Sequence, residues 1–160
     1  MAGNKKAKRV SANTRPKGIN GKRPCLSVVV NVTREEIEEQ SRKMKMIPLV
    51  SLEKFRTSTA TMWDWRTIEF RCFVGHEIAK ALYTEEAVEG LQAALDAIAV
   101  IRARIIGMQD GTLSATTEET DTIRMALEAT DEMQDELNSK DQLDFYRKAE
   151  KIISENDKKK

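Results

Sequence analysis

Residues 84–107 read TEEAVEGLQAALDAIAVIRARIIG and carry the strongest structural signal in this chain of 160 residues. Their apolar side chains recur every three or four positions, which places them on one face of an α-helix. These side chains are Ala87, Leu91, Ala94, Ile98, Ile101 and Ile105. Thr84 provides a helix N-cap and Gly107 a helix end, so the sequence predicts an amphipathic helix between them.

A second helix is predicted immediately before the first, from residue 63 to residue 82. Its apolar stripe consists of Trp65, Ile68, Cys72, Ala79 and Leu82, widened by Trp63, Phe73 and Ile78. Only Tyr83 and Thr84 separate the two helices, and so short a connection places neighbouring helices antiparallel. We therefore expect a helical hairpin.

Upstream of the hairpin, the chain predicts one helix and an additional helical turn. Thr33 and Glu36 have the spacing of a capping box, in which each side chain accepts a hydrogen bond from a free amide of the first turn. The helix that starts there is expected to end at Pro48, because proline lacks the amide N–H that a helix interior needs. Residues 51–55 form the expected extra turn, and residues 57–61 form a connection.

Downstream of the hairpin, two further helices are predicted. Thr116 and Glu119 have the spacing of another capping box, and the helix behind it extends to about residue 137. Its apolar stripe consists of Ile123, Ala126 or Leu127, Thr130, Met133 and Leu137. The last helix is expected from about residue 141 to residue 153. Its apolar side chains are Leu143, Tyr146, Ala149, Ile152 and Ile153.

Together these segments predict an all-α fold, a small antiparallel bundle of four or five helices. The composition of 40% hydrophobic, 33% charged and 5% aromatic residues suits helices with one apolar face better than a β-sandwich. One β-branched run, residues 26–32, is expected to form a short strand or an extended lead-in to the helices. We expect a single domain over residues 25–155, followed by a frayed basic tail over residues 156–160.

The N-terminal segment differs in charge from the rest of the chain. Residues 1–23 contain eight basic side chains and no acidic one, whereas residues 24–160 contain 19 basic and 26 acidic side chains. The eight basic residues are Lys5, Lys6, Lys8, Arg9, Arg15, Lys17, Lys22 and Arg23. Residues 1–24 have almost no large apolar side chain, so we expect a disordered arm. Such an arm would contact nucleic acid without sequence specificity by neutralising phosphates.

Acidic side chains gather on the helix predicted after Thr116. Those that share one face of it are Asp121, Glu128, Glu132 and Asp135. This face admits two interpretations. It is either a solvated surface or a docking surface for a basic partner, which would be another protein or the basic arm of a second copy of this chain.

The sequence argues against an enzyme and against a metal or cofactor site. His76 and Glu77 begin like the helical zinc-protease motif, but Lys80 occupies the position of the second histidine, and the chain has one histidine. Cys25 and Cys72 lie far apart with no second pair, which suggests neither a disulfide scaffold nor a zinc site. No apolar run reaches the length of a membrane span, so we expect a cytoplasmic protein.

Two tryptophans lie near basic residues, an arrangement that can hold unpaired nucleic-acid bases. Trp65 falls on the apolar stripe with Ile68 and Cys72, so core packing is expected for it. For Trp63 two roles stay open, namely an exposed ligand contact and an apolar staple at the start of the helix.

The hairpin resembles one degenerate tetratricopeptide repeat over residues 71–95. The residues at the packing positions of such a repeat are Val74, Gly75, Ile78, Ala87, Leu91, Ala94 and Leu95. Small residues where helices cross let two backbones approach, and large ones fill the space on either side. Arg71 stands where the repeat has tryptophan, and no proline closes the second helix.

The chain also resembles small bacteriophage and prophage proteins that pair a basic leader with a short helical body. The resemblance is carried by PLVSLEKF at residues 48–55, DWRTI at residues 64–68, Arg71 and Gly75. It implies a phage origin and, with that origin, a location in the host cytoplasm. No activity follows from it.

These observations predict a non-catalytic helical interaction module whose basic arm contacts nucleic acid. The alternative is a protein-binding or assembly adaptor, acting on the host or on a second copy, that uses its acidic helix and has no nucleic-acid role. No cofactor is expected in either case.

Overall fold

The computed structural model describes residues 33–106 and 113–159. The chain separates into the units Met1–Ile37 and Glu38–Lys160, and the first of these is described only at its end, where helix α2 begins. Every contact discussed below lies within Glu38–Lys160. The predicted arm and the β-branched run at residues 26–32 lie outside the described residues.

Five α-helices make up most of the described residues. They are α2 (Arg34–Arg56), α3 (Met62–Leu82), α4 (Glu85–Ile106), α5 (Thr117–Asp135) and α6 (Ser139–Lys158). Apart from one isolated bridge between Ala60 and Leu113, this part of the chain contains no β-pairing. The all-α prediction is confirmed, and so are the helices expected at residues 63–82 and 85–106.

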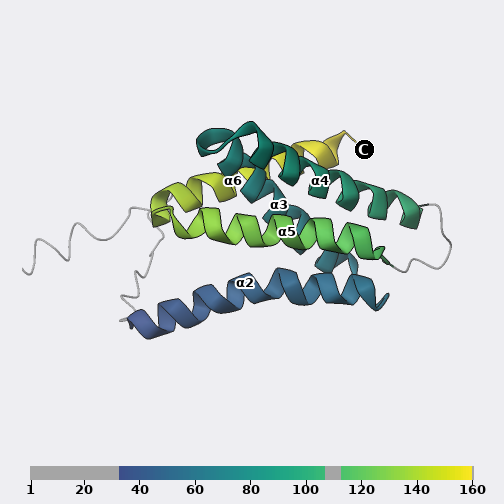
Figure 1. Ribbon diagram of the computed structural model, residues 1–160, viewed down its shortest axis with the longest axis horizontal. Coiled ribbons are helices and arrows are strands. Elements are labelled where there is room, and N and C mark those ends of the chain that lie inside the picture. The colour runs from purple at the N-terminus through teal and green to yellow at the C-terminus, as the bar shows by residue number, and fades with distance from the viewer. Residues whose placement is uncertain (1–32, 107–112, 160) are drawn as a thin grey trace, which may run out of the picture. The chain divides into compact units, whose positions relative to one another are not determined.

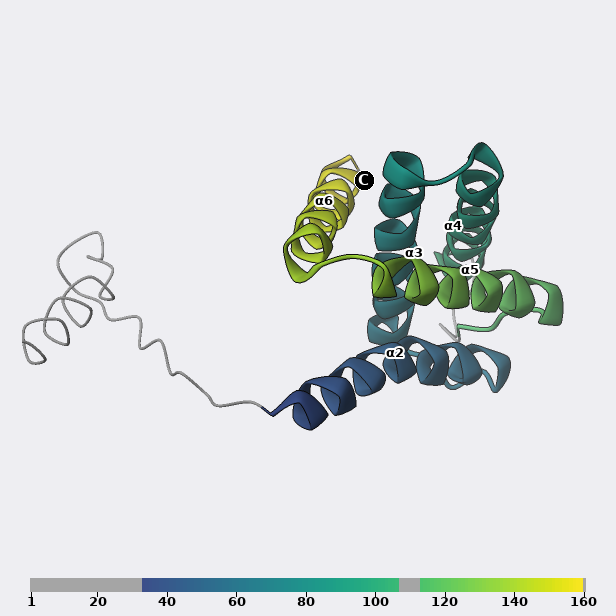
Figure 2. The same ribbon diagram turned by 60° about the vertical axis from the view of Figure 1, so that its left-hand side comes forward.

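Helix α3 is the central element of the bundle and packs against α4, α5 and α6. Figure 2 shows α3 and α4 side by side, with α5 crossing them. The core side of α3 carries the buried residues Trp65, Ile68, Cys72, Val74, Ile78 and Ala79. The indole N–H of Trp65 donates a hydrogen bond of 3.1 Å to the backbone carbonyl of Ile98 on α4. This bond satisfies the one polar atom of the buried ring.

Helix α2 lies beside α5 and runs antiparallel to it (Figure 1). The Lys45 ammonium donates to the Asp135 carboxylate at 2.6 Å, and Arg124 donates to Glu53 at 2.7 Å. The two pairs occur in opposite order along the two helices, which fixes their antiparallel direction. The C-terminal part of α2 enters the core through the buried residues Ser51, Leu52 and Phe55.

The expected end of the first helix at Pro48 is wrong, because α2 continues through Pro48 to Arg56. Proline in a helix interior removes a hydrogen bond and costs roughly 3 kcal/mol or more. Burial of Leu52 and Phe55 beyond it stabilises the continuation, since each fully buried side chain of this size contributes about 1.5–3 kcal/mol. The turn expected at residues 51–55 is thus the last part of α2.

Capping boxes fix the starts of α3 and α5. At α5, as predicted, the Thr116 hydroxyl accepts a hydrogen bond from the Glu119 amide and the Glu119 carboxylate accepts one from the Thr116 amide. Thr61 and Asp64 form a second capping box at α3, which the sequence patterns did not indicate. For the capping box predicted at Thr33, the Glu36 side chain lies outside the described residues.

Some apolar side chains predicted to face the core are exposed instead. Leu82 is 58% exposed and Leu143 is 47% exposed, whereas Phe145, outside the predicted stripe, is buried. Helix α6 also continues past its predicted end at residue 153 to Lys158. The core face of α6 is therefore rotated from the predicted one, and this rotation leaves Leu143 on the surface.

Candidate protein-docking groove

Of the two sites predicted from the sequence, only the acidic one falls in the described residues. The basic residues of the arm, Lys5, Lys6, Lys8, Arg9, Arg15, Lys17, Lys22 and Arg23, lie outside them. The predicted acidic residues Asp121, Glu128, Glu132 and Asp135 all lie on α5, at the surface of the protein. Their spacing along the helix places them on one face, and the exposed Met125 shares it.

Part of this acidic face is already engaged within the protein. Lys45 on α2 contacts both carboxylate oxygens of Asp135 at 2.6 Å. No described residue forms an ion pair with the other three carboxylates, those of Asp121, Glu128 and Glu132. The face therefore keeps three solvated carboxylates and one exposed methionine.

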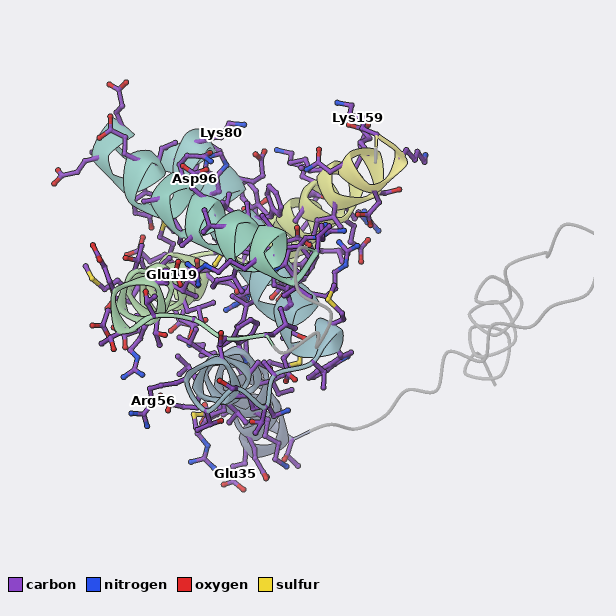
Figure 3. All side chains as sticks on the ribbon, turned by 90° about the vertical axis from the view of Figure 1, so that its right-hand side faces the viewer. Glu35, Arg56, Lys80, Asp96, Glu119 and Lys159 are labelled. Atoms are coloured by element: carbon purple, nitrogen blue, oxygen red, sulfur yellow. The ribbon has the colours of Figure 1, made fainter. Side chains whose placement is uncertain are left out.

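The remaining carboxylates of α5 include two that hold the bundle together. Glu119, labelled in Figure 3, lies at the start of α5. Its carboxylate accepts hydrogen bonds from the Arg104 guanidinium, which joins the start of α5 to the end of α4. Asp131 accepts a hydrogen bond from Arg71 on α3. Both pairs are largely shielded from solvent on the carboxylate side, so these residues serve the fold.

The residues with reactive side chains lie in unreactive surroundings. Cys72 is fully buried, and burial raises the pKa of its thiol to about 12. His76 is half-buried next to Glu77, and burial, followed by the charge of Lys80, lowers its pKa and so favours the neutral imidazole. No group of His, Cys, Asp and Glu side chains suited to a metal ion occurs in the described part of the chain.

None of the described helices is long and apolar enough to cross a membrane.

A groove that the sequence patterns did not predict lies between α2, α3 and α6. Its volume is about 600 Å³. Its apolar lining consists of Met44, Ile47 and Pro48 from α2, Trp63 and Phe70 from α3, and Leu143 and Tyr146 from α6. Met44 and Trp63 are each more than 60% exposed.

A second hollow of about 490 Å³ adjoins the first. It is lined on the apolar side by Met46, Ile47, Val50 and Trp63. Because Ile47 and Trp63 line both hollows, the two form one continuous surface with the Trp63 indole between them. We call this combined surface the Trp63 groove.

Local helix geometry brings Trp63 to this surface. Successive residues of an α-helix are turned by about 100°, so residues two positions apart point to nearly opposite sides. Trp65 enters the core, and Trp63 consequently faces solvent. The Thr61–Asp64 capping box holds this first turn of α3 in place.

Phe70, Arg71 and Tyr146 form the inner part of the groove. The Phe70 and Tyr146 rings pack with centroids 5.9 Å apart, which joins α3 to α6. The Tyr146 hydroxyl accepts hydrogen bonds from Arg71 and from Gln134. The inner part is therefore fixed by ring packing and hydrogen bonds, whereas the methionines at the rim are exposed and unbranched.

The charged residues of the Trp63 groove are nearly all basic. Its two hollows are lined by Arg42, Lys43, Lys54, Arg66, Arg71 and Arg147, against the single acidic residue Glu150. Residues 24–160 have the opposite excess, with 26 acidic side chains against 19 basic ones. The basic lining is thus a local departure from an acidic body.

These basic residues fall into two groups. Those held by at least one shielded carboxylate are Lys54 with the buried Asp64, Arg66 with the half-buried Glu69 and also the exposed Asp157, and Arg71 with the half-buried Asp131. Those at the rim are Lys43 and Arg147, whose partners Glu39 and Asp144 are exposed on the same helices, and Arg42. No hydrogen bond or ion pair engages Arg42 among the described residues. Only the rim group is available to an approaching ligand.

A comparison with protein-family models, with curated proteins and with solved structures finds no match for this chain.

Proposed function

We propose that this protein is a non-catalytic helical interaction module that binds another protein through the Trp63 groove. The observation that carries the proposal is the clustering of exposed apolar side chains. Six of the twelve large apolar side chains exposed in the described residues line the groove: Met44, Met46, Ile47, Val50, Trp63 and Leu143. Scattered exposed apolar residues are ordinary, but a contiguous patch rimmed by polar residues marks an interaction site.

The residue types in the groove support a protein partner. Tryptophan, methionine and arginine are enriched where proteins bind one another, and a few aromatic anchors carry most of the binding energy. Methionine side chains adapt to the shape of a partner because they are unbranched and polarisable. Trp63, between the two hollows, is the residue that we expect to act as the anchor.

Site-specific photo-crosslinking in the cells that produce the protein tests this function. A benzophenone amino acid at Met44, on the groove, should crosslink a discrete protein, and the further change Trp63→Ala should abolish the product. Asp96, exposed on α4 and outside the groove, is the matched control position (Figure 3). Equal products from Met44 and Asp96, or none from Met44, would contradict the proposal.

The basic arm supports a second activity, contact with nucleic acid. Eight basic and no acidic side chains over residues 1–23 give a segment that attracts phosphates. Replacing Lys5, Lys6, Lys8 and Arg9 with glutamine in the full chain should reduce the slope of log affinity for duplex DNA against log salt by up to about 4, about one per residue. An unchanged affinity and slope would remove this role from the arm.

A further inference from the structure

We infer that the element bound in the Trp63 groove is an amphipathic helix of the partner with acidic flanks. The inference rests on the proposed function and specifies its partner. It combines the helical walls of the groove, its two connected apolar hollows and the basic character of its rim.

The walls of the groove favour a helix over an extended strand. Every lining residue belongs to α2, α3 or α6, and helical hydrogen bonds engage most of their backbone amides and carbonyls. The exceptions are isolated groups, the Met44 carbonyl opposite Pro48 and the first-turn amides of α3, and they do not form the continuous edge of a sheet. A strand would need a sheet edge with free backbone groups, and the groove has none among its described residues. A bound helix needs only an apolar surface for its own stripe of side chains at positions i, i+3, i+4 and i+7. The two connected hollows on either side of Trp63 provide that surface.

The charges at the rim of the groove favour acidic over basic residues on the flanks of the bound helix. Arg42 has no partner in the described residues, and the ion pairs of Lys43 and Arg147 join exposed side chains on one helix, where an ion pair contributes little. These three side chains can therefore turn to carboxylates on the flanks of a bound helix. Basic flanks would meet the same residues as like charges.

Nucleic acid and a second copy of this chain fit the groove less well. Nucleic acid needs available cations along its whole path, but in this groove they lie only at the rim. Arg66 and Arg71, the basic residues nearest the inner part, are held by Asp157, Glu69 and Asp131. The exposed acidic helix of a second copy, α5, offers one large exposed apolar side chain, Met125, to a groove that has room for several.

A titration of the full chain with three labelled peptides, followed by fluorescence anisotropy, tests the inference. Each peptide is long enough for about five helical turns. The first peptide has Leu and Phe at i, i+3, i+4 and i+7 with glutamates on both flanks. The second replaces the glutamates with lysines, and the third scrambles the first. The acidic helix should bind at least tenfold more tightly than either of the others.

Variants of the full chain locate the binding. Trp63→Ala should weaken binding of the acidic peptide by about 30-fold, the loss typical of an interface anchor. Arg42→Glu should weaken it severalfold and reduce its salt dependence, because rim charges act mainly through long-range attraction. Val100→Ala, at an exposed position on α4, is the matched control and should leave the affinity unchanged. Trp63 and Arg42 are exposed, so their variants should fold.

Several results would overturn the inference. They are equal affinity for the acidic and lysine peptides, no effect of Trp63→Ala, and a single-stranded DNA oligonucleotide that binds more tightly than the peptide and depends on Trp63. A dimer that dissociates when peptide is added would make a second copy the occupant. A tenfold gain in peptide affinity from Val29→Asp would make residues 26–32 the occupant. Crosslinking from Met44 without peptide binding would refute the acidic helix and leave the proposed function standing.

Discussion

Trp63 and Trp65 stand two positions apart in the first turn of α3 and occupy opposite environments. Trp65 is 2% exposed, and its indole N–H is bonded to the carbonyl of Ile98, whereas Trp63 is 61% exposed in the groove. The core tryptophan also lies near arginines, since the Arg66 and Arg102 guanidinium groups stack on Trp65 at 5.2 Å and 4.9 Å from its ring centroid. One tryptophan thus packs in the core, and the other lies exposed at the surface.

The two environments predict distinct fluorescence for two single-tryptophan variants. Trp65→Phe leaves Trp63, whose emission should lie at long wavelength and be quenched readily by iodide. Trp63→Phe leaves Trp65, whose emission should be shifted to the blue and resist quenching. Similar quenching in both variants, with helical content unchanged by circular dichroism, would contradict the assignment of the two faces.

Gly75 lies where α3 packs closely against α5 and α4. A Cβ atom at this position would lie 2.0 Å from Thr130 Oγ1 on α5 and 3.1 Å from Leu91 Cδ2 on α4. Thr130 cannot move aside easily, because it is buried and its hydroxyl donates to the Ala126 carbonyl at 2.7 Å. Gly75→Ala should therefore lower the free energy of unfolding by about 1–3 kcal/mol, as overpacking does.

Gly90 provides the matched control for this prediction. It lies inside α4, and a Cβ atom there would meet nothing within 4 Å. Gly90→Ala should be neutral or stabilise the protein by up to about 1 kcal/mol, because alanine is the better helix former. Urea unfolding of both variants measures the contrast, and equal effects at the two positions would refute the close crossing at Gly75.

Asp64 predicts a specific dependence of stability on acid. Burial raises the pKa of its carboxyl, but hydrogen bonds from Lys54, Thr61 and Ser51 outweigh burial and lower the pKa to about 2. A carboxyl whose folded pKa is depressed contributes stability above its unfolded pKa, and that contribution is lost as the pH falls through the folded value. The loss should occur between about pH 4 and pH 2.

Asp64→Asn isolates this contribution from that of other carboxylates. The wild type should exceed the variant by on the order of 2 kcal/mol in unfolding free energy at pH 7, the scale of hydrogen bonds to a charged group. The difference should shrink as the pH is lowered from 4 to 2. Chemical unfolding at several pH values measures it, and a difference independent of pH would show that the carboxylate charge is not what stabilises the start of α3.

Leu91 tests the packing of the hairpin. It is buried between α4 and its neighbours, so Leu91→Ala should cost about 2–5 kcal/mol. Leu82→Ala removes the same atoms from an exposed position and should change the stability by no more than about 0.5 kcal/mol. A cost near zero for Leu91→Ala in a chemical melt would refute the assignment of the core face of α4.

The sequence predicts the elements of this fold better than it predicts their faces. Regular spacing located α3 and α4, and the Thr116–Glu119 capping box located the start of α5, because these signals are local. Pro48 misled the prediction for α2, since the burial of Leu52 and Phe55 that outweighs it depends on contacts made by distant parts of the chain.

Local sequence patterns could not predict the Trp63 groove, for a related reason. Met44, Trp63 and Leu143 come from three helices. The sequence pattern placed Leu143 on an apolar stripe, left the role of Trp63 open and did not single out Met44. Only the rotation of α6 and the antiparallel placement of α2 leave them together on the surface. The acidic face of α5 was predictable because all its residues lie on one helix, but its Asp135 contact with Lys45 was not.

The indole N–H signals of the full chain test the central claim most directly. The protein contains two tryptophans, so a nitrogen-15 correlation spectrum shows two indole signals, one from Trp63 in the groove and one from Trp65 in the core. We predict that the acidic amphipathic peptide shifts the Trp63 signal in a saturable way and leaves that of Trp65 in place. An unchanged Trp63 signal at saturating peptide, or an equal shift of both signals, would contradict the claim that the Trp63 groove is the docking surface.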